Sequence, residues 1–215
     1  MLTLYSYFRS SASHRVRIAL NLKGLPYTYL PVHLLKDGGQ QHTAEYQRIN
    51  PAELVPTLVD DGHALGQSLA IMEYLDETHV EPPLMPRDPL GRARVRALAQ
   101  AVACEIHPLN NLRVLQYLGN DLKVDEATKA MWYRHWITVG FTAIEAMLAN
   151  HPSTGTYCHG DMPGMADCCL IPQVANSRRF DTPLERFPTL VRIDTHCRAL
   201  PAFVAAAPEN QSDAV

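Results

Sequence analysis

Residues 8–20 decide the fold, and they read Phe8-Arg9-Ser10-Ser11-Ala12-Ser13-His14-Arg15-Val16-Arg17-Ile18-Ala19-Leu20. The segment Leu2–Tyr5 before them has the alternation of a short strand. The apolar residues from Val16 to Leu22 fit a helix with one buried face, which Ser13 or a neighbouring serine can cap. The stretch therefore predicts a strand that ends in a hydroxyl-rich loop at a helix N-terminus, an arrangement that favours an anion. A helix cap with surplus serines is the simpler interpretation of the same residues.

The first eighty residues alternate between predicted strands and helices. The first helix should span residues 13–23 and end at Gly24. We expect further strands at 27–33 and 55–59, a turn at Asp60–His63 into Ala64–Leu65, and helices at about 44–49 and from Ser68 onward. This order of elements predicts a small mixed sheet covered by helices.

The second half of the chain reads as helical. Four prolines within residues 82–89 predict a linker, and no strand pattern follows it. Helical spacing recurs from Val95 to Ile106, with a kink expected at Pro108. A second helix should bury the face formed by Trp132, Trp136, Val139, Ala143 and Met147, and a third should start near Met165 and be interrupted at Pro172. Short helices should follow Pro188 and Pro201, and residues 208–215 should form a loose tail. We therefore predict an α/β domain over residues 1–81, a linker over 82–89 and an all-α domain over 90–215.

Composition narrows the class of protein. The 215 residues carry a net charge of −3, which offers no electrostatic case for binding nucleic acid or an anionic membrane. The sequence contains neither an apolar run long enough to span a bilayer nor a signal peptide, so we expect a cytoplasmic protein. All five cysteines lie between residues 104 and 197 without Cys-x-x-Cys or zinc spacing, and this predicts buried reduced thiols and no metal site. A disulfide oxidoreductase is also disfavoured, because the predicted α/β domain has no cysteine.

The opening stretch resembles the signature of zeta-class glutathione transferases, which is Ser-Ser-Cys-Ser followed by Trp or His and then Arg-Val-Arg-Ile-Ala-Leu. Only Ala12 departs from it, at the usual cysteine. The likeness runs from Leu4 to about Phe187. It implies a thioredoxin-like N-terminal domain followed by the all-helical glutathione-transferase C-terminal domain, glutathione as the cofactor, and a homodimer.

The resemblance also assigns a glutathione site. Ser10 or Ser11 would lie nearest the sulfur and lower the pKa of the thiol, and spacing alone does not choose between them. Tyr5 and Tyr7 compete in principle. An X-Pro bond that opens a strand at a sheet edge would leave the backbone of Val55 unpaired, and the family has a cis proline at Pro56. The remaining residues that the likeness places near glutathione are Gln67 and Ser68 (the latter at the expected helix N-cap), Gln41, His107 and Asn111. Lys36, in the same loop as Gln41, is interpreted as no more than a solvated charge.

The arginines predict a small dicarboxylate substrate, because guanidinium groups bind carboxylates in a bidentate manner. The related maleylpyruvate isomerases use arginines that match Arg9, Arg113 and Arg179, whereas maleylacetoacetate isomerases often lack the one at Arg113. The intact Asp37–Gln41 loop is typical of the latter enzymes. Arg15 and Arg17, on the first helix, can pair with carboxylates of the fold.

The resemblance implies an enzyme, a glutathione-dependent cis–trans isomerase that converts maleylacetoacetate to fumarylacetoacetate in tyrosine and phenylalanine breakdown. Ser10, Ser11 and Arg9 are the expected catalytic residues. The alternatives are a maleylpyruvate isomerase of gentisate breakdown, a general glutathione transferase acting on haloacids, and a non-catalytic glutathione-binding protein.

Overall fold

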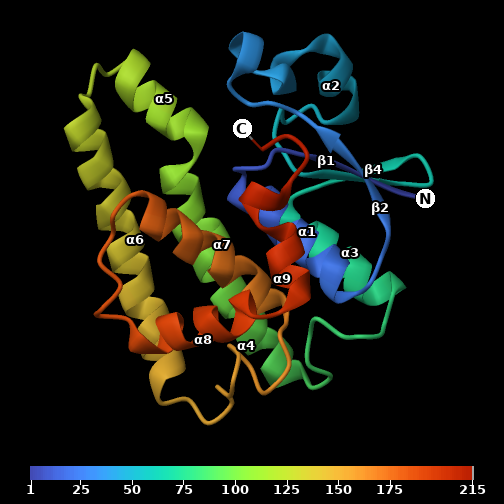
Figure 1. The fold of residues 1–215 in the computed structure, drawn as a ribbon, viewed down its shortest axis with the longest axis vertical. Helices are drawn as coiled ribbons and strands as arrows, with labels where there is room; N and C mark the ends of the chain where they lie inside the picture. Colours follow the sequence, from blue (N-terminus) through green and yellow to red (C-terminus); the bar gives the residue numbers. More distant parts are fainter. Residues whose placement is uncertain (215) are drawn as a thin grey trace. The chain divides into compact units, whose positions relative to one another are not determined.

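The computed structural model describes residues 1–214 and divides them into two compact units (Figure 1). Unit 1 comprises residues 1–84 together with residues 198–214, and unit 2 comprises Met85–Cys197. Unit 1 is an α/β structure, and unit 2 is helical throughout. The predicted fold class is therefore confirmed, although the last segment of the chain belongs to unit 1 and not to the helical part.

Unit 1 contains a four-stranded sheet in the order β2-β1-β3-β4. Its strands are β1 (Leu2–Ser6), β2 (Tyr27–Pro31), β3 (Thr57–Asp60) and β4 (His63–Gly66). Strand β1 runs parallel to β2 and antiparallel to β3, and β4 returns antiparallel to β3. The accompanying helices are α1 (Ser11–Leu22), α2 (Ala44–Ile49) and α3 (Ser68–Thr78), so the predicted order of strands and helices is confirmed.

The core of unit 1 forms where α1 and α3 pack on the sheet. Leu4 and Leu58 sit opposite each other on paired strands, and both are fully buried. They pack with the apolar residues of the helices, Val16, Leu20, Ile71 and Leu75. A second hydrophobic cluster consists of Tyr7, Phe8, Val32, Tyr46 and Val55. Alternation along the strands and 3.6-residue spacing along the helices thus bury the side chains that the sequence pattern selects.

The helical unit contains α4 (Pro89–Gln100), α5 (Leu112–Asn120), α6 (Glu126–Ala149), α7 (Met165–Arg179) and most of α8 (Pro188–Arg198). A π-helical turn, η3 (Ala101–Ile106), and a 3-10 turn, η4 (His107–Asn110), follow α4. The regular α-helix therefore ends ahead of Pro108, where a kink is expected from the sequence. Four of the five cysteines are buried as predicted, but Cys104 on η3 is exposed.

Two details of the helical unit differ from the sequence prediction. Helix α7 continues without interruption through Pro172, because the residues on both sides of the proline are buried and their packing outweighs one missing N–H bond. Helix α6 buries Tyr133, Ile137, Phe141, Ile144 and Leu148, while Val139 and Met147 are exposed. The predicted face was wrong because α6 is apolar on more than one side, and periodicity then identifies a helix without identifying its buried stripe.

The end of the chain returns to unit 1. Helix α9 (Pro201–Ala206) packs on α1, where Asn21 Nδ2 donates to the carbonyl of Ala202 at 3.0 Å. The 3-10 turn η5 (Pro208–Asn210) follows, and Asp213 accepts hydrogen bonds from Phe8 and Tyr29. The expected loose tail is therefore wrong: polar side chains and backbone groups of unit 1 bind this segment.

Within residues 1–214, no helix is both long and apolar enough to cross a membrane, and no group of His, Cys, Asp or Glu side chains could hold a metal ion.

Candidate functional site

The sheet brings four predicted site segments to one of its ends. Ser6 pairs with Pro31, so the parallel strands β1 and β2 finish at the same level. Tyr5 pairs with Thr57 and Thr57 pairs with Gly66, so β3 begins and β4 ends at this level too. The segments attached there carry Ser10 after β1, Gln41 after β2, Val55-Pro56 before β3 and Gln67-Ser68 after β4.

Ser10 ends the turn after β1 and caps α1. Its N–H donates to the carbonyl of Tyr7 at 3.0 Å, and its Oγ accepts from the N–H of Ser13 at 3.2 Å. Helix α1 therefore begins at Ser11, two residues earlier than expected. Ser10 is partly exposed whereas Ser11 is buried. Because the Ser10 oxygen is already an acceptor, its hydroxyl hydrogen can be directed at an anion beside the helix N-terminus.

The two tyrosines near this loop have other surroundings. The ring of Tyr5 lies 5.8 Å from the ring of Tyr46, and Tyr7 is buried with its ring 4.9 Å from that of His33. Both tyrosines belong to the packing around the loop, which leaves the serines as its hydroxyl donors at the helix N-terminus.

The Val55-Pro56 bond is cis, as the resemblance implied. Val55 lies just ahead of β3, and its N–H and C=O make no hydrogen bond with any other residue of the described chain. These groups lie beyond the end of an inner strand and not at a sheet edge, because β3 is flanked by β1 and β4. An extended ligand backbone can pair with such groups.

Side chains from α2 and the loop after it hold the Val55-Pro56 bond from both sides. The hydroxyl of Tyr46 and the amide of Asn50 both donate to the carbonyl of Leu54, at 2.6 and 2.8 Å. The same two groups bind Thr57 Oγ1, at 2.9 and 3.0 Å. The residues before and after Val55-Pro56 are therefore anchored to the same pair of side chains.

Gln67 and Ser68 begin α3 in a different arrangement from the one expected. Gln67 is the N-cap, with a φ of +65° that non-glycine residues rarely adopt, and its side chain is exposed. Strained residues of this kind concentrate at ligand-binding positions. Ser68 is buried in the first turn, and its Oγ accepts a hydrogen bond from Arg15 Nη1 at 3.1 Å. Arg15 thus connects the starts of α1 and α3.

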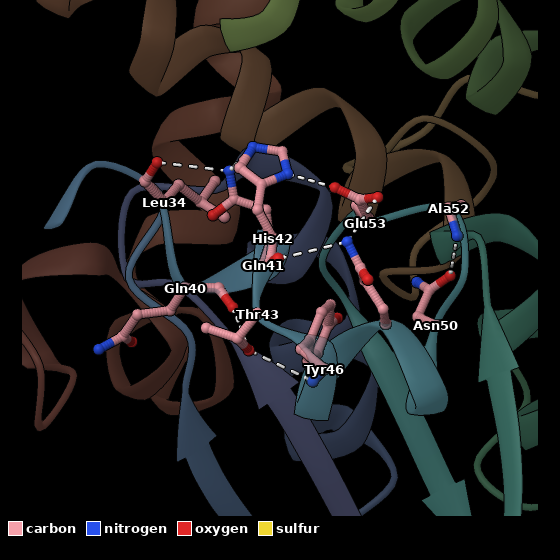
Figure 2. A network of polar contacts seen from close by, with 10 residues as sticks. Leu34, Gln40, Gln41, His42, Thr43, Tyr46, Asn50, Ala52 and Glu53 are labelled. Carbon is pink, nitrogen blue, oxygen red and sulfur yellow. Dashed lines mark hydrogen bonds and ion pairs between the residues drawn. The ribbon is translucent and has the colours of Figure 1, made fainter. Parts of the chain in front are cut away.

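Gln41 occupies a short turn that the Asp37-Gly38-Gly39 bend shapes (Figure 2). Its amide nitrogen donates to the carbonyl of Leu34 at 3.5 Å and to His42 Nε2 at 2.9 Å. The other ring nitrogen of His42 bonds to Glu53, as the dashed lines of Figure 2 show. The Gln41 Oε1 is buried and has no partner within residues 1–214, so it is an acceptor that a ligand N–H could satisfy. Lys36 is exposed beside this turn.

Unit 2 carries the other predicted site residues. Asn111 caps α5 by accepting from the N–H of Arg113 at 3.1 Å, and its amide lies 3.4 Å from His107 Nε2. Arg113 itself is exposed on the first turn of α5. Arg179 is exposed at the end of α7, with its guanidinium 4.9 Å from the centre of the Phe180 ring. Burial raises the pKa of Tyr133 to about 12, and the positive charge of Arg179 counteracts this shift.

The arginines fall into two groups. Among residues 1–214, no carboxylate pairs with Arg9, Arg113 or Arg179. By contrast Arg178, next to Arg179, bonds to the buried carboxylate of Asp194 at 2.5 Å. An exposed guanidinium without an internal counter-ion can bind a carboxylate from solution. The three arginines that the resemblance selected all belong to this group.

Sequence reasoning missed what Arg15 and Arg17 do. Both are buried. Arg15 Nη1 donates to the Ser68 hydroxyl, and the hydrogen bonds of Arg17 go to hydroxyl and carbonyl oxygens. Arg17 binds the Ser6 hydroxyl, the Tyr7, Phe8 and Ala206 carbonyls, and nothing acidic within hydrogen-bonding distance. The available signal was their position among the apolar residues of α1, where a cation is buried only if polar groups surround it.

Comparisons with known proteins agree with this geometry. The family described as "Glutathione S-transferase, N-terminal domain" matches residues 4–83. A probable maleylacetoacetate isomerase of Vibrio cholerae is 53% identical over 213 residues, which cover 99% of this chain and 98% of that protein.

Two solved structures are similarly close. A maleyl pyruvate isomerase, described as a bacterial glutathione S-transferase of the zeta class, aligns with a TM-score of 0.95 and 48% identity over 99% of this chain and 100% of its own. A maleylacetoacetate isomerase from Methylobacterium extorquens AM1 with bound malonate and GSH has a TM-score of 0.95 and 40% identity, with 99% of each chain covered. These similarities extend over both units.

Proposed function

The chain belongs to the zeta class of the glutathione S-transferase family, and from this premise we propose that it is a glutathione-dependent isomerase that converts maleylacetoacetate to fumarylacetoacetate. One observation carries the proposal: the serine loop, the unpaired backbone of Val55 and the Gln67-Ser68 turn meet at one end of the sheet. The identity of 53% to a probable maleylacetoacetate isomerase supports the choice of substrate.

We assign glutathione to these segments. The hydroxyl of Ser10 would donate to the sulfur and favour the thiolate, with Ser11 as the second candidate. Val55, preceding Pro56, would pair with the cysteinyl backbone, Gln67 and Ser68 would hold the γ-glutamyl end, and Gln41 would bind the glycyl end. In unit 2, His107 and Asn111 are assigned to glutathione from the family likeness alone.

The reaction follows from a nucleophilic thiolate and a polarised double bond. The sulfur adds to one carbon of the cis double bond, and the electron pair of that bond moves into the adjacent carbonyl as an enolate. Rotation about the resulting single bond and expulsion of the thiolate then give the trans product and regenerate glutathione. Arg9, Arg113 and Arg179 would hold the substrate's negatively charged groups and stabilise the enolate, so positioning and charge provide the rate enhancement. Ala12 shows that no enzyme thiol is available in this loop.

Two observations favour related substrates. The presence of Arg113 and the 48% identity to a maleyl pyruvate isomerase favour maleylpyruvate as the second candidate. A general transferase that conjugates haloacids needs the same thiolate but not the three arginines. A non-catalytic glutathione-binding protein would need neither the serine loop nor the arginines.

The experiment that tests the function measures turnover of maleylacetoacetate and maleylpyruvate by ultraviolet absorbance, with and without glutathione. Glutathione-dependent formation of one trans product would establish the isomerase and name its substrate. Turnover of neither compound, with haloacid conjugation intact, would reject the isomerase in favour of a transferase.

We further propose that the protein is a cytoplasmic homodimer, by analogy with its family. Light scattering of the purified protein tests the oligomeric state, and a monomer at micromolar concentration would reject it.

Gly39→Ala should weaken glutathione binding through Gln41. A Cβ at Gly39 would lie 2.6 Å from the Gln41 amide nitrogen, and the φ of +101° strains any L-residue there. Gly38→Ala is the matched control, because its φ is +82° but a Cβ would meet nothing within 4 Å. We expect both variants to lose about 1 kcal/mol of folding free energy in urea titrations. Calorimetry should show weaker glutathione affinity for Gly39→Ala alone, and equal affinities would remove Gln41 from the site.

A further inference from the structure

The turn that delivers Ser10 is held by side chains from two distant parts of unit 1. It runs from Tyr7 to Ser10 and is closed by the Ser10 N–H bond to the Tyr7 carbonyl at 3.0 Å. Phe8 is therefore an inner residue of the turn, and its backbone N–H and C=O take no part in the closing bond. Their partners decide where the turn, and with it Ser10, is placed.

Both backbone groups of Phe8 are occupied. Its N–H donates to Asp213 Oδ2 at 3.1 Å, across 205 residues of sequence, and its carbonyl accepts from Arg17 Nη2 at 3.0 Å. Arg17 Nη1 also donates to the Tyr7 carbonyl at 3.3 Å. One side of the turn is thus fixed by the chain's last residues and the other by a buried guanidinium of α1.

The last residues are themselves anchored in unit 1. The hydroxyl of Tyr29, on β2, donates to Asp213 Oδ1 at 2.6 Å. Ala214 packs against the cluster that contains Tyr7, Phe8 and Val55, and Arg17 Nε donates to the carbonyl of Ala206 at 3.0 Å. Figure 1 shows the segment that follows α9 beside the connection between β1 and α1.

Arg17, Tyr29 and Asp213 also interact electrostatically. Burial lowers the pKa of Arg17 to about 10, and the nearby Tyr29, Tyr27 and Asp213 counteract this shift. Burial, followed by the hydrogen bond to Asp213, raises the pKa of Tyr29, so its hydroxyl stays a donor at neutral pH. The carboxylate of Asp213 therefore serves as a nearby negative charge for the guanidinium that holds the turn.

We infer that Asp213 is a positioning residue for catalysis: the carboxylate fixes the Tyr7–Ser10 turn and so holds the Ser10 hydroxyl where glutathione's sulfur binds. This inference rests on the proposed function, in which Ser10 stabilises the thiolate. Asp213 bonds to Phe8 and Tyr29 and not to Ser10. It acts through the N–H of Phe8, because a sub-ångström shift of a hydroxyl donor weakens its bond to a thiolate.

The test compares Asp213→Ala and Asp213→Asn with Glu209→Gln. Glu209 is the matched control, since it is an acidic residue of the same segment whose exposed side chain bonds to no other described residue. The readouts are the pKa of enzyme-bound glutathione, from the pH dependence of ultraviolet thiolate absorbance, together with kcat, glutathione affinity and melting temperature.

We expect Asp213→Ala to lower kcat about tenfold and to raise the thiol pKa by about one unit, with glutathione affinity changed less than about threefold. Asp213→Asn keeps the volume of the side chain and one acceptor, so it should fold like the parent and show a smaller change in the same direction. Glu209→Gln should match the parent in every readout.

The inference would be overturned if both Asp213 variants had the same thiol pKa and kcat as Glu209→Gln. A fall in melting temperature without any change in the thiol pKa would overturn it too. The two proposals fail separately. A parent that turns over neither maleyl substrate refutes the isomerase, whereas an active parent with indifferent Asp213 variants refutes only the role of Asp213.

Discussion

Ser10→Ala should lower kcat about 10²-fold while leaving glutathione affinity within about threefold of the parent, because the lost hydroxyl acts on the thiolate and on the developing charge and not on the peptide backbone. A free thiol has a pKa of about 8.5, so little thiolate exists at neutral pH unless the site stabilises it. The thiol pKa of bound glutathione should therefore rise toward this value in the variant. Stopped-flow turnover and ultraviolet titration of the bound thiol measure the two effects.

Ser11→Ala is the internal control for this experiment. Ser11 is adjacent to Ser10 but buried, whereas Ser10 is partly exposed and caps α1. Loss of the Ser10 cap should also cost about 1 kcal/mol of stability, so activity must be compared at a temperature where both variants are folded. If Ser10→Ala turns over normally and Ser11→Ala does not, the role of thiolate donor passes to Ser11.

Arg113→Ala should reduce kcat/KM for the maleyl substrate by about 10- to 100-fold, the cost of one charge-assisted contact to a carboxylate. Conjugation of glutathione to a neutral aryl halide should be unchanged, since that reaction has no carboxylate to bind. Arg113→Lys keeps the charge but loses the two-pronged geometry, so it should recover only part of the activity. Steady-state kinetics on both substrates provide the comparison.

Arg186→Ala controls for the loss of one surface charge. Arg186 is exposed in unit 2, and its side chain makes no hydrogen bond or ion pair with another residue of the described chain. Its removal should leave both activities as they are. Isomerisation by Arg113→Ala at the parental rate would show that the carboxylate assignment is wrong and would favour the general transferase.

Local sequence patterns were sufficient to predict many of the strands and helices of this fold. The strand, serine loop and helix at the N-terminus follow from alternation and helical spacing within a few residues of one another, and the structure confirms them as β1, Ser10 and α1. Pro188 and Pro201 are also local signals, because proline favours the first position of a helix, and α8 and α9 begin at these residues. The cis bond before Pro56 was expected from the family resemblance of the residues around Val55-Pro56 and not from their spacing.

Prediction from the sequence pattern failed where one pattern is compatible with more than one structure. Trp132 and Val139 have the spacing of a helix face, yet the buried stripe of α6 runs through Tyr133 and Ile137. The apolar residues of α6 surround much of the helix, so only its neighbours decide which side is buried. Pro172 reads as a helix breaker, and only the packing around α7 shows that the helix continues.

The amino-acid sequence by itself determined the order of elements, which depends on spacing along the chain, and the family, which follows from the resemblance of its motifs. Only the tertiary structure decided that Ser68 is held by Arg15, that Arg17 binds backbone carbonyls, and that Asp213 reaches Phe8. Every residue has a carbonyl and nearly every residue an N–H, so contacts to the backbone leave no signature in a sequence. A bond between residues 8 and 213 exists only once the fold has brought the two ends of the chain together.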